Sequence, residues 1–151
     1  MVRYTQVVAD LLLLPNFIDY YYKELETAKR DCVIHGSVEK QLSALPGVTE
    51  HRFNQLQEIE ALLNYLNIQH RKTRHTHYKK YLENYGKALT SKDAQVYADA
   101  EDEVIDSDVL INELALIRNK YLGILKGLES KNFQLGHIAR LRSAGLEDIS
   151  V

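Results

Sequence analysis

The sequence contains few residues that interrupt helices or cross-link chains. Of its 151 residues, two are proline, seven are glycine and one, Cys32, is cysteine. A single cysteine can form neither an intramolecular disulfide bond nor a cysteine-rich zinc site, and thiol-poor chains of this size are typical of a reducing compartment. We therefore expect a cytosolic protein. The scarcity of glycine and proline favours long, uninterrupted helices.

Long hydrophobic runs are also missing. The longest, Leu11–Leu14, is far shorter than the roughly 20 apolar residues that a membrane-spanning helix needs, and no signal-peptide pattern accompanies it. With 45% hydrophobic and 26% charged residues, the chain is too apolar to be wholly disordered. Its length suits one domain. We expect a single helical domain over residues 1–151 with no membrane partner.

Apolar residues recur at spacings of three and four along the chain, as the buried side of a helix requires, and no strand-like alternation is present. Residues 1–46 are predicted to form N-terminal helices separated at Pro15. The second of these is expected to continue through Gly36 to Pro46; an end near Ile34 is the alternative.

Two longer helical segments follow Pro46. Residues 48–86 are predicted to form a basic helix capped by Thr49, with a coiled-coil seam from Phe53 to Leu66. Residues 91–144 are predicted to form acidic and then apolar C-terminal helices: a long one to about Glu129 and a short one capped by Asn132.

The predicted lengths do not suit a sphere. A helix of about 35 residues exceeds 50 Å, whereas a compact globule of this chain length is about 30 to 35 Å across. We therefore expect an all-α fold: an elongated helical hairpin of long amphipathic helices, with short N- and C-terminal helices. Its apolar stripes need partners, which indicates self-association or docking onto another protein.

Charge is segregated along the two long segments. Residues 70–87 contain six lysines and arginines against one glutamate, and residues 93–113 contain eight acidic residues and no lysine or arginine. We call these the basic block and the acidic block. Histidines and tyrosines are interleaved with the basic block, a mixture that suits single-stranded nucleic acid because cations follow phosphates and flat rings stack on unpaired bases. The candidate DNA-binding residues are Arg71, Lys72, Arg74, His75, Tyr78, Lys79 and Lys80.

An intramolecular explanation competes with this one. If the two helices form an antiparallel hairpin, the acidic block can lie beside the basic block and neutralise it across a solvated interface. The charge pattern alone slightly favours this explanation, because such runs are usually solvated helix faces.

Metal and catalytic chemistry have little support. His70 and His77 are two helical turns apart, about 10 Å, which is too far for one ion. The run Asp99–Asp108 lacks the glycine and the closing glutamate of a calcium loop. No phosphate loop or nucleophile elbow is present, and Cys32 lies in an apolar context typical of packing. We expect no enzyme activity, no metal and no cofactor.

The C-terminal third carries a more specific pattern. After the apolar stretch Tyr121–Leu125, a small residue and a base are followed by an amphipathic segment; the residues concerned are Ser130, Lys131, Phe133, Leu135, His137, Ile138, Leu141 and Arg142. This run resembles the C-terminal end of the UvsY recombination mediators of T-even-like phages. Upstream, Ile59-Glu60-Ala61 followed by a basic stretch is similar in kind and order.

The resemblance implies a non-enzymatic accessory of homologous recombination in the cytoplasm of the infected bacterial host. Such mediators bind single-stranded DNA as a homo-oligomer, which the resemblance puts at six or seven subunits. They weaken the hold of the single-strand-binding protein and help a RecA-like recombinase to form its filament. In the family a Lys-x-Arg pair contributes to DNA binding; Lys72-x-Arg74 is the nearest pair of that form here.

The resemblance also implies that the C-terminal helices drive oligomerisation, in line with their long apolar stripe. The predicted interface residues are Ile117, Tyr121, Ile124, Leu125, Leu128, Phe133, Ile138 and Leu141. The rival hypothesis is an adaptor or structural coiled coil that binds only protein partners, with the charge segregation serving helix pairing.

Overall fold

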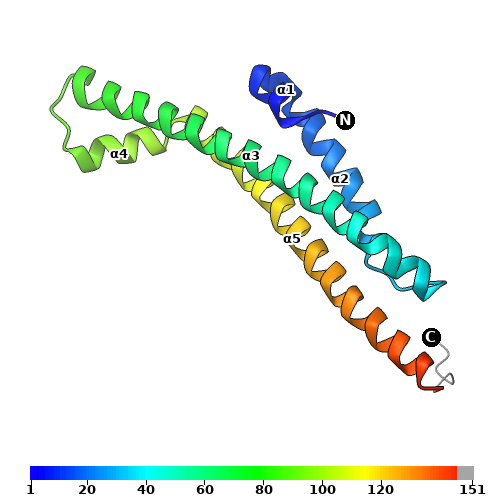
Figure 1. The fold of residues 1–151 in the computed structure, drawn as a ribbon. Helices are drawn as coiled ribbons and strands as arrows, with labels where there is room; N and C mark the ends of the chain where they lie inside the picture. Colours follow the sequence, from blue (N-terminus) through cyan, green and yellow to red (C-terminus); the bar gives the residue numbers. More distant parts are fainter. Residues whose placement is uncertain (146–151) are drawn as a thin grey trace.

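The computed structural model describes residues 1–145, and all of the regular structure in this range is helical (Figure 1). The elements are α1 (Tyr4–Ala9), a 3₁₀ turn η1 (Leu11–Leu13), α2 (Leu14–Asp31), α3 (Val38–Asn84), α4 (Ser91–Asp99) and α5 (Asp102–Ser143). The predicted all-α fold class is confirmed. Within residues 1–145, no helix is both long and apolar enough to cross a membrane.

Two helices dominate the molecule. The 47 residues of α3 and the 42 residues of α5 lie side by side and run in opposite directions (Figure 1). Helix α2 packs beside the N-terminal half of α3, whereas α4 folds back along the C-terminal end of α3 (Figure 1). Residues 70–108 therefore extend beyond α1 and α2. We call this part of the molecule, which comprises the end of α3, the connection, α4 and the start of α5, the arm.

The second helix ends earlier than predicted. Helix α2 stops at Asp31, so the predicted continuation through Gly36 to Pro46 is wrong. Gly36 adopts a positive φ of 72°, a conformation that side chains disfavour and that a helix does not contain. The hydroxyl of Ser37 then accepts a hydrogen bond from the backbone N–H of Lys40 and caps α3.

The predicted boundary at Pro46 is also wrong, because α3 runs through this residue without a break. A proline inside a helix removes one backbone hydrogen bond and costs about 3 kcal/mol. Burial of Leu45 beside it helps to offset this cost. Thr49, expected to cap the basic helix, lies inside α3, where its hydroxyl donates to the carbonyl of Leu45 at 2.9 Å. The predicted basic helix is thus part of a longer one that begins ten residues earlier, at Val38.

Two further boundaries differ in the acidic and apolar segments. The helix predicted from Ser91 is divided at Ala100 into α4 and α5, which lets α4 pack back onto α3. The predicted break before Asn132 is absent, and α5 continues to Ser143. Burial of Lys131 and Leu135 keeps this stretch against the rest of the molecule, and the Lys131 ammonium donates to the carbonyl of Asp31 at 2.8 Å.

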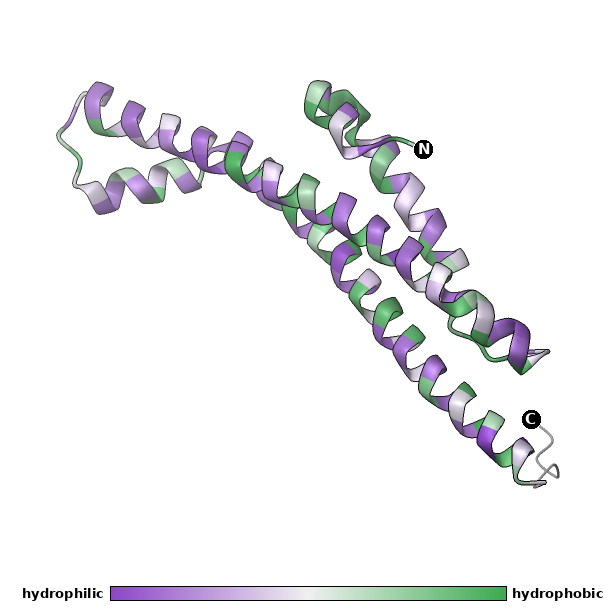
Figure 2. Cartoon of the chain, viewed as in Figure 1, coloured by the Kyte–Doolittle hydropathy of each residue, from purple (hydrophilic) through white to green (hydrophobic). Residues whose placement is uncertain are grey.

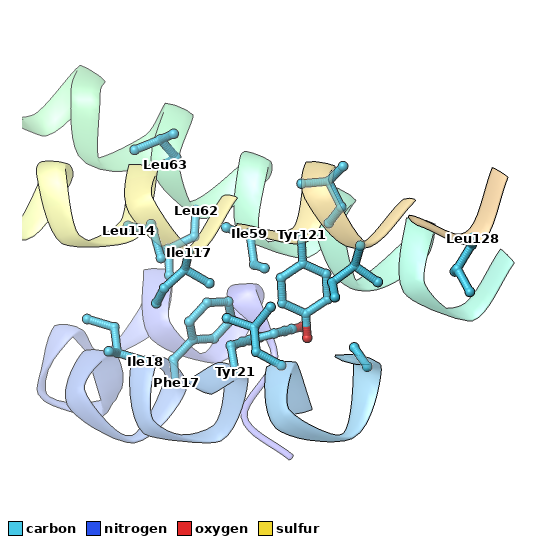
Figure 3. Close-up of a cluster of buried hydrophobic side chains, with 14 of the residues drawn as sticks. Phe17, Ile18, Tyr21, Ile59, Leu62, Leu63, Leu114, Ile117, Tyr121 and Leu128 are labelled. Carbon is cyan, nitrogen blue, oxygen red and sulfur yellow. The ribbon is translucent and has the colours of Figure 1, made fainter. Parts of the chain in front are cut away.

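The core lies where α2, α3 and α5 meet (Figure 3). Phe17 and Tyr21 of α2 pack with tilted rings at a centroid distance of 4.5 Å, and Tyr21 meets Tyr121 of α5 edge to face at 5.9 Å. Ile59 and Leu62 of α3 complete the cluster. Each of these apolar side chains contributes about 1.5 to 3 kcal/mol when it is fully buried.

A polar network crosses the same three helices. The guanidinium of Arg52, only 4% exposed, donates to Glu24 at 2.8 Å and pairs with Asp31 at 2.7 Å, which ties α3 to α2. The amide of Gln55 donates to Glu24, and its carbonyl accepts from the hydroxyl of Tyr121 at 3.2 Å. Hydrogen bonds from Gln55 and Arg52 lower the pKa of Glu24. Local sequence pattern does not reveal this network, because its members are widely separated along the chain.

We predict that Arg52→Met destabilises the protein by about 2 kcal/mol, because it leaves the carboxylates of Glu24 and Asp31 without their buried cation. The free energy of unfolding in urea measures the loss. Arg30→Met, which removes an exposed arginine from α2, is the matched control and should change stability by less than about 0.5 kcal/mol. Equal stability of the two variants would show that the network does not hold α2 in place.

Candidate nucleic-acid interface

The arm carries a groove lined by predicted DNA-binding residues. Arg71, Arg74, His75 and Tyr78 follow one another at helical spacings of three, one and three, which places them on one face of α3. Together with Gln95 and Ala98 of α4, they line an open groove of about 400 Å³. Four of the seven predicted DNA-binding residues therefore meet at one site.

Helix α4 forms the second wall of this groove because small residues let it approach α3 closely. Ala94 and Ala98, one helical turn apart, are both fully buried. The hydroxyl of Thr90 caps α4 by accepting from the backbone N–H of Asp93 at 3.1 Å. The part of α4 in this site was not predicted from the sequence; the pair of alanines four residues apart was the available signal.

The groove combines cations with flat rings. The rings of His75 and Tyr78 stack with a centroid distance of 6.3 Å and an interplanar angle of 29°. Arg74 forms a two-pronged ion pair with Asp99 of α4, in which one N–H···O distance is 2.8 Å. This pairing lowers the pKa of Asp99 and partly neutralises Arg74. Arg71 has no ion-pair partner within 4.0 Å among residues 1–145.

The three remaining predicted residues are exposed lysines. Lys72 and Lys79 are seven residues apart and lie on the same side of α3, next to the groove face. The ammonium of Lys80 lies 5.7 Å from the centre of the Tyr81 ring. None of the three makes an ion pair within the described part of the chain. Hydrophilic residues predominate along the ribbon of the arm (Figure 2).

The acidic block neutralises a different part of α3. His70 lies 3.3 Å from Asp108, and His77 lies 3.0 Å from Glu103; these contacts are ion pairs when the imidazoles are protonated. The hydroxyl of Tyr81 donates to Glu101 at 2.5 Å. Together with the Arg74–Asp99 pair, these contacts hold the start of α5 and the end of α4 against α3. The acidic block therefore lies partly beside the basic block, as the intramolecular explanation expects, whereas Arg71, Lys72, Lys79 and Lys80 make no ion pair in the described residues.

The remaining chemical candidates have structural positions. No group of three or more histidine, cysteine, aspartate or glutamate side chains that could hold a metal ion occurs in residues 1–145. Cys32 packs where α2 meets α5, with its sulfur 3.6 Å from the carbonyl oxygen of Ile124, and burial raises the pKa of its thiol. Gly127 lies against this sulfur, where a side chain would collide with it.

The predicted oligomer interface is divided by the structure. Four of its eight residues, namely Ile117, Tyr121, Ile124 and Leu128, are buried within the chain's own core, so their contacts are intramolecular. We correct their assignment: α2 covers this stretch of α5, which the periodicity of α5 could not reveal. Phe133 is 65% exposed, Leu141 is also exposed, and Ile138 is partly buried against the core.

Leu125, the eighth residue, lines an apolar groove of about 550 Å³ between the N-terminal half of α3 and the C-terminal half of α5. Leu45, Pro46 and Phe53 form the α3 side of it. Phe53 was predicted to lie in a coiled-coil seam but is largely exposed. Accessible apolar surface therefore remains at the end of the molecule opposite the arm.

Protein-family models, curated proteins and solved structures contain no match to this chain. The resemblance to recombination mediators thus rests mainly on the sequence pattern of residues 121–142. In the structure these residues lie on α5, where Ser130, Phe133, His137 and Arg142 are exposed and Lys131 and Leu135 are buried.

Proposed function

We propose that this chain is a single-stranded DNA-binding recombination mediator, and that DNA binds along the arm. The observation that carries the proposal is the groove in which Arg71, His75 and Tyr78 converge beside exposed Lys72 and Lys79. Cations beside flat rings suit a strand whose phosphates and unpaired bases are both accessible. A duplex offers phosphates but keeps its bases stacked inside, so the rings would have no partner.

The energetics indicate a weak site in one chain. Contact with about four phosphates predicts that log affinity falls with log salt at a slope of about −3, at 0.7 per phosphate for single strands. Such electrostatic binding alone gives dissociation constants of about 10⁻⁴ to 10⁻⁶ M. Several sites joined in one assembly raise avidity by roughly 10² to 10⁴. A homo-oligomer of elongated hairpins therefore suits the proposed function.

The proposal extends to partners through the resemblance at residues 121–142. In this hypothesis the assembly has six or seven subunits and works in the cytoplasm of an infected bacterial host. It loosens single-strand-binding protein from DNA and helps a RecA-like recombinase to load. Bending of a DNA strand across several arms strains the strand. This strain supplies a physical means of weakening its binding to the single-strand-binding protein.

The alternative function is a coiled-coil adaptor that binds only protein. Ile105, Val109 and Leu116 of α5 favour it, because they are exposed apolar residues at roughly helical spacing beside the acidic block. Single-strand binding measured against duplex binding over a range of salt separates the two functions. An adaptor would bind neither form of DNA at physiological salt.

The first functional prediction concerns the unpaired cations of the arm. Changing Arg71, Lys72, Lys79 and Lys80 together to alanine should abolish measurable single-strand binding, because the phosphate contacts that carry affinity are lost. Fluorescence anisotropy with a labelled oligonucleotide measures binding, and circular dichroism checks helix content. The control variant changes Lys23, Lys29, Arg30 and Lys40, which are exposed and lie outside the arm, to alanine. Equal loss in both variants would contradict binding at the arm.

A second prediction concerns Asp99, which competes with phosphate for Arg74. Asp99→Asn should raise single-strand affinity by up to about five-fold, equivalent to the roughly 1 kcal/mol of an exposed ion pair. Asp106→Asn removes the same charge from an exposed position on α5. If both variants raise affinity equally, the effect is one of net charge, and Arg74 does not contact DNA.

A third prediction concerns assembly. Replacing Phe133 and Leu141 with aspartate should dissociate the oligomer without unfolding the chain, because each buried apolar side chain at an interface contributes about 1.5 to 3 kcal/mol. Sedimentation velocity measures the particle. Leu12→Asp removes an exposed leucine near the N-terminus as the control. An unchanged particle in the double variant would place the interface elsewhere.

A further inference from the structure

A cluster of three tyrosines lies near the tip of the arm. Tyr81 belongs to α3, Tyr85 follows the end of that helix, and Tyr97 belongs to α4, which lies beside it (Figure 1). The ring of Tyr97 stacks on Tyr81 at 5.4 Å and 27°, and on Tyr85 at 6.0 Å and 25°. The Tyr81 and Tyr85 rings are 5.7 Å apart. Three rings therefore form one compact surface.

The cluster is rigidly supported yet open to solvent. The hydroxyl of Tyr81 donates to Glu101 at the junction of α4 and α5, which fixes the ring at the base of the cluster. Buried Ala94 and Ala98 hold α4 against α3. Tyr85 and Tyr97 nevertheless remain 48% and 45% exposed. Core tyrosines of this chain, such as Tyr121, are fully buried, so burial does not account for this cluster.

The cluster continues the basic groove. Arg71, Arg74, Tyr78 and Tyr81 follow one another at spacings of three, four and three residues, which aligns them along one side of α3 over about 15 Å. Tyr85 follows directly after the end of this helix. The groove occupies the first half of this line and the tyrosine cluster the second half.

Charge around the cluster suits a polyanion. The Lys80 ammonium lies 5.7 Å from the centre of the Tyr81 ring, and Lys79 and Lys87 are exposed along the adjacent chain. Among the carboxylates around the cluster, Glu101 accepts from Tyr81 and Asp99 is held by Arg74, whereas Glu83 and Asp93 are exposed.

We propose that Tyr81, Tyr85 and Tyr97 form a stacking platform for unpaired nucleobases, reached by a strand whose phosphates follow Arg71, Lys72 and Lys79. This inference rests on the proposed DNA-binding function. It adds the part of the site that binds the bases, and so distinguishes a single strand of DNA from a sugar-phosphate backbone without bases. Every base has a flat face, so the platform accepts bases without sequence preference. Exposed Val96 and Leu82 nearby would suit a protein partner instead, and the experiment separates these outcomes.

The first experiment uses the unaltered protein and two strands of equal length and charge. One is oligothymidine of about 16 nucleotides, the upper end of common site sizes, and the other is the same backbone with abasic sugars. Stacking of one base on an aromatic side chain predicts that oligothymidine binds roughly 5- to 150-fold more tightly than the abasic strand. The slopes of log affinity against log salt should be equal, because both strands carry the same phosphates. Equal affinities for the two strands would overturn the platform.

The second experiment locates the preference. Tyr85→Ala together with Tyr97→Ala should remove most of the preference for oligothymidine over the abasic strand, with the remainder due to the rings of His75, Tyr78 and Tyr81, and should leave the salt slope unchanged. Tyr85→Phe with Tyr97→Phe keeps both rings and should bind like the parent. Val96→Ala removes an exposed side chain of α4 beside the platform and should also have no effect. Should the double alanine variant lose helix content, Tyr85→Ala alone tests the platform, since this residue lies beyond the end of α3.

The outcomes separate the two hypotheses. If the parent binds neither strand, both the proposed function and the platform fail. If the four-residue alanine variant of the basic block loses binding while the tyrosine variants keep full preference for oligothymidine, only the platform fails. Full DNA binding by the tyrosine variants would then leave a protein partner as the occupant of this surface.

Discussion

Burial of one side of α3 against α5 is the constraint on which the rest of the molecule depends. A helix of 47 residues spans about 70 Å, more than one globular core can cover, so its apolar side needs a partner of similar length. Helix α5 supplies this partner, and α2 covers the middle of the pair with Phe17 and Tyr21. Beyond α2 the pair of helices continues as the arm. There the contacts between α3 and its neighbours α4 and α5 include polar pairs.

The same pairing selects which charges stay accessible. Because α4 and α5 occupy the interior side of the arm, Asp99, Glu103 and Asp108 contact Arg74, His77 and His70. Arg71, Lys72, Lys79 and Lys80 point elsewhere on α3 and make no ion pair in the described residues. One side of α3 thus pairs its cations with carboxylates inside the arm, and another side leaves its cations exposed. An overall charge of −2 conceals this asymmetry.

Core and arm serve separable roles in our proposals. The core holds its large aromatic residues and the Arg52 network among three helices, whereas the arm keeps its rings and cations at the surface. Substitutions in the arm can therefore change binding with little loss of stability, because few of its side chains fill the core. At the opposite end of the molecule, exposed Phe133 and the apolar groove beside Leu125 leave surface for assembly without obstructing the arm.

Local pattern was enough to predict the helical fold class and a helix that carries the basic residues 71–80, because helical periodicity depends only on neighbours along the chain. Tertiary packing decided what local rules could not. Packing offset the free-energy cost of Pro46 inside α3. It also let α5 continue through Asn132, and it buried Ile117 beneath α2. Packing also brought Tyr97 next to α3 and paired only some of the cations of α3 with carboxylates. Local spacing could not predict these contacts, because it does not encode the distances between remote segments.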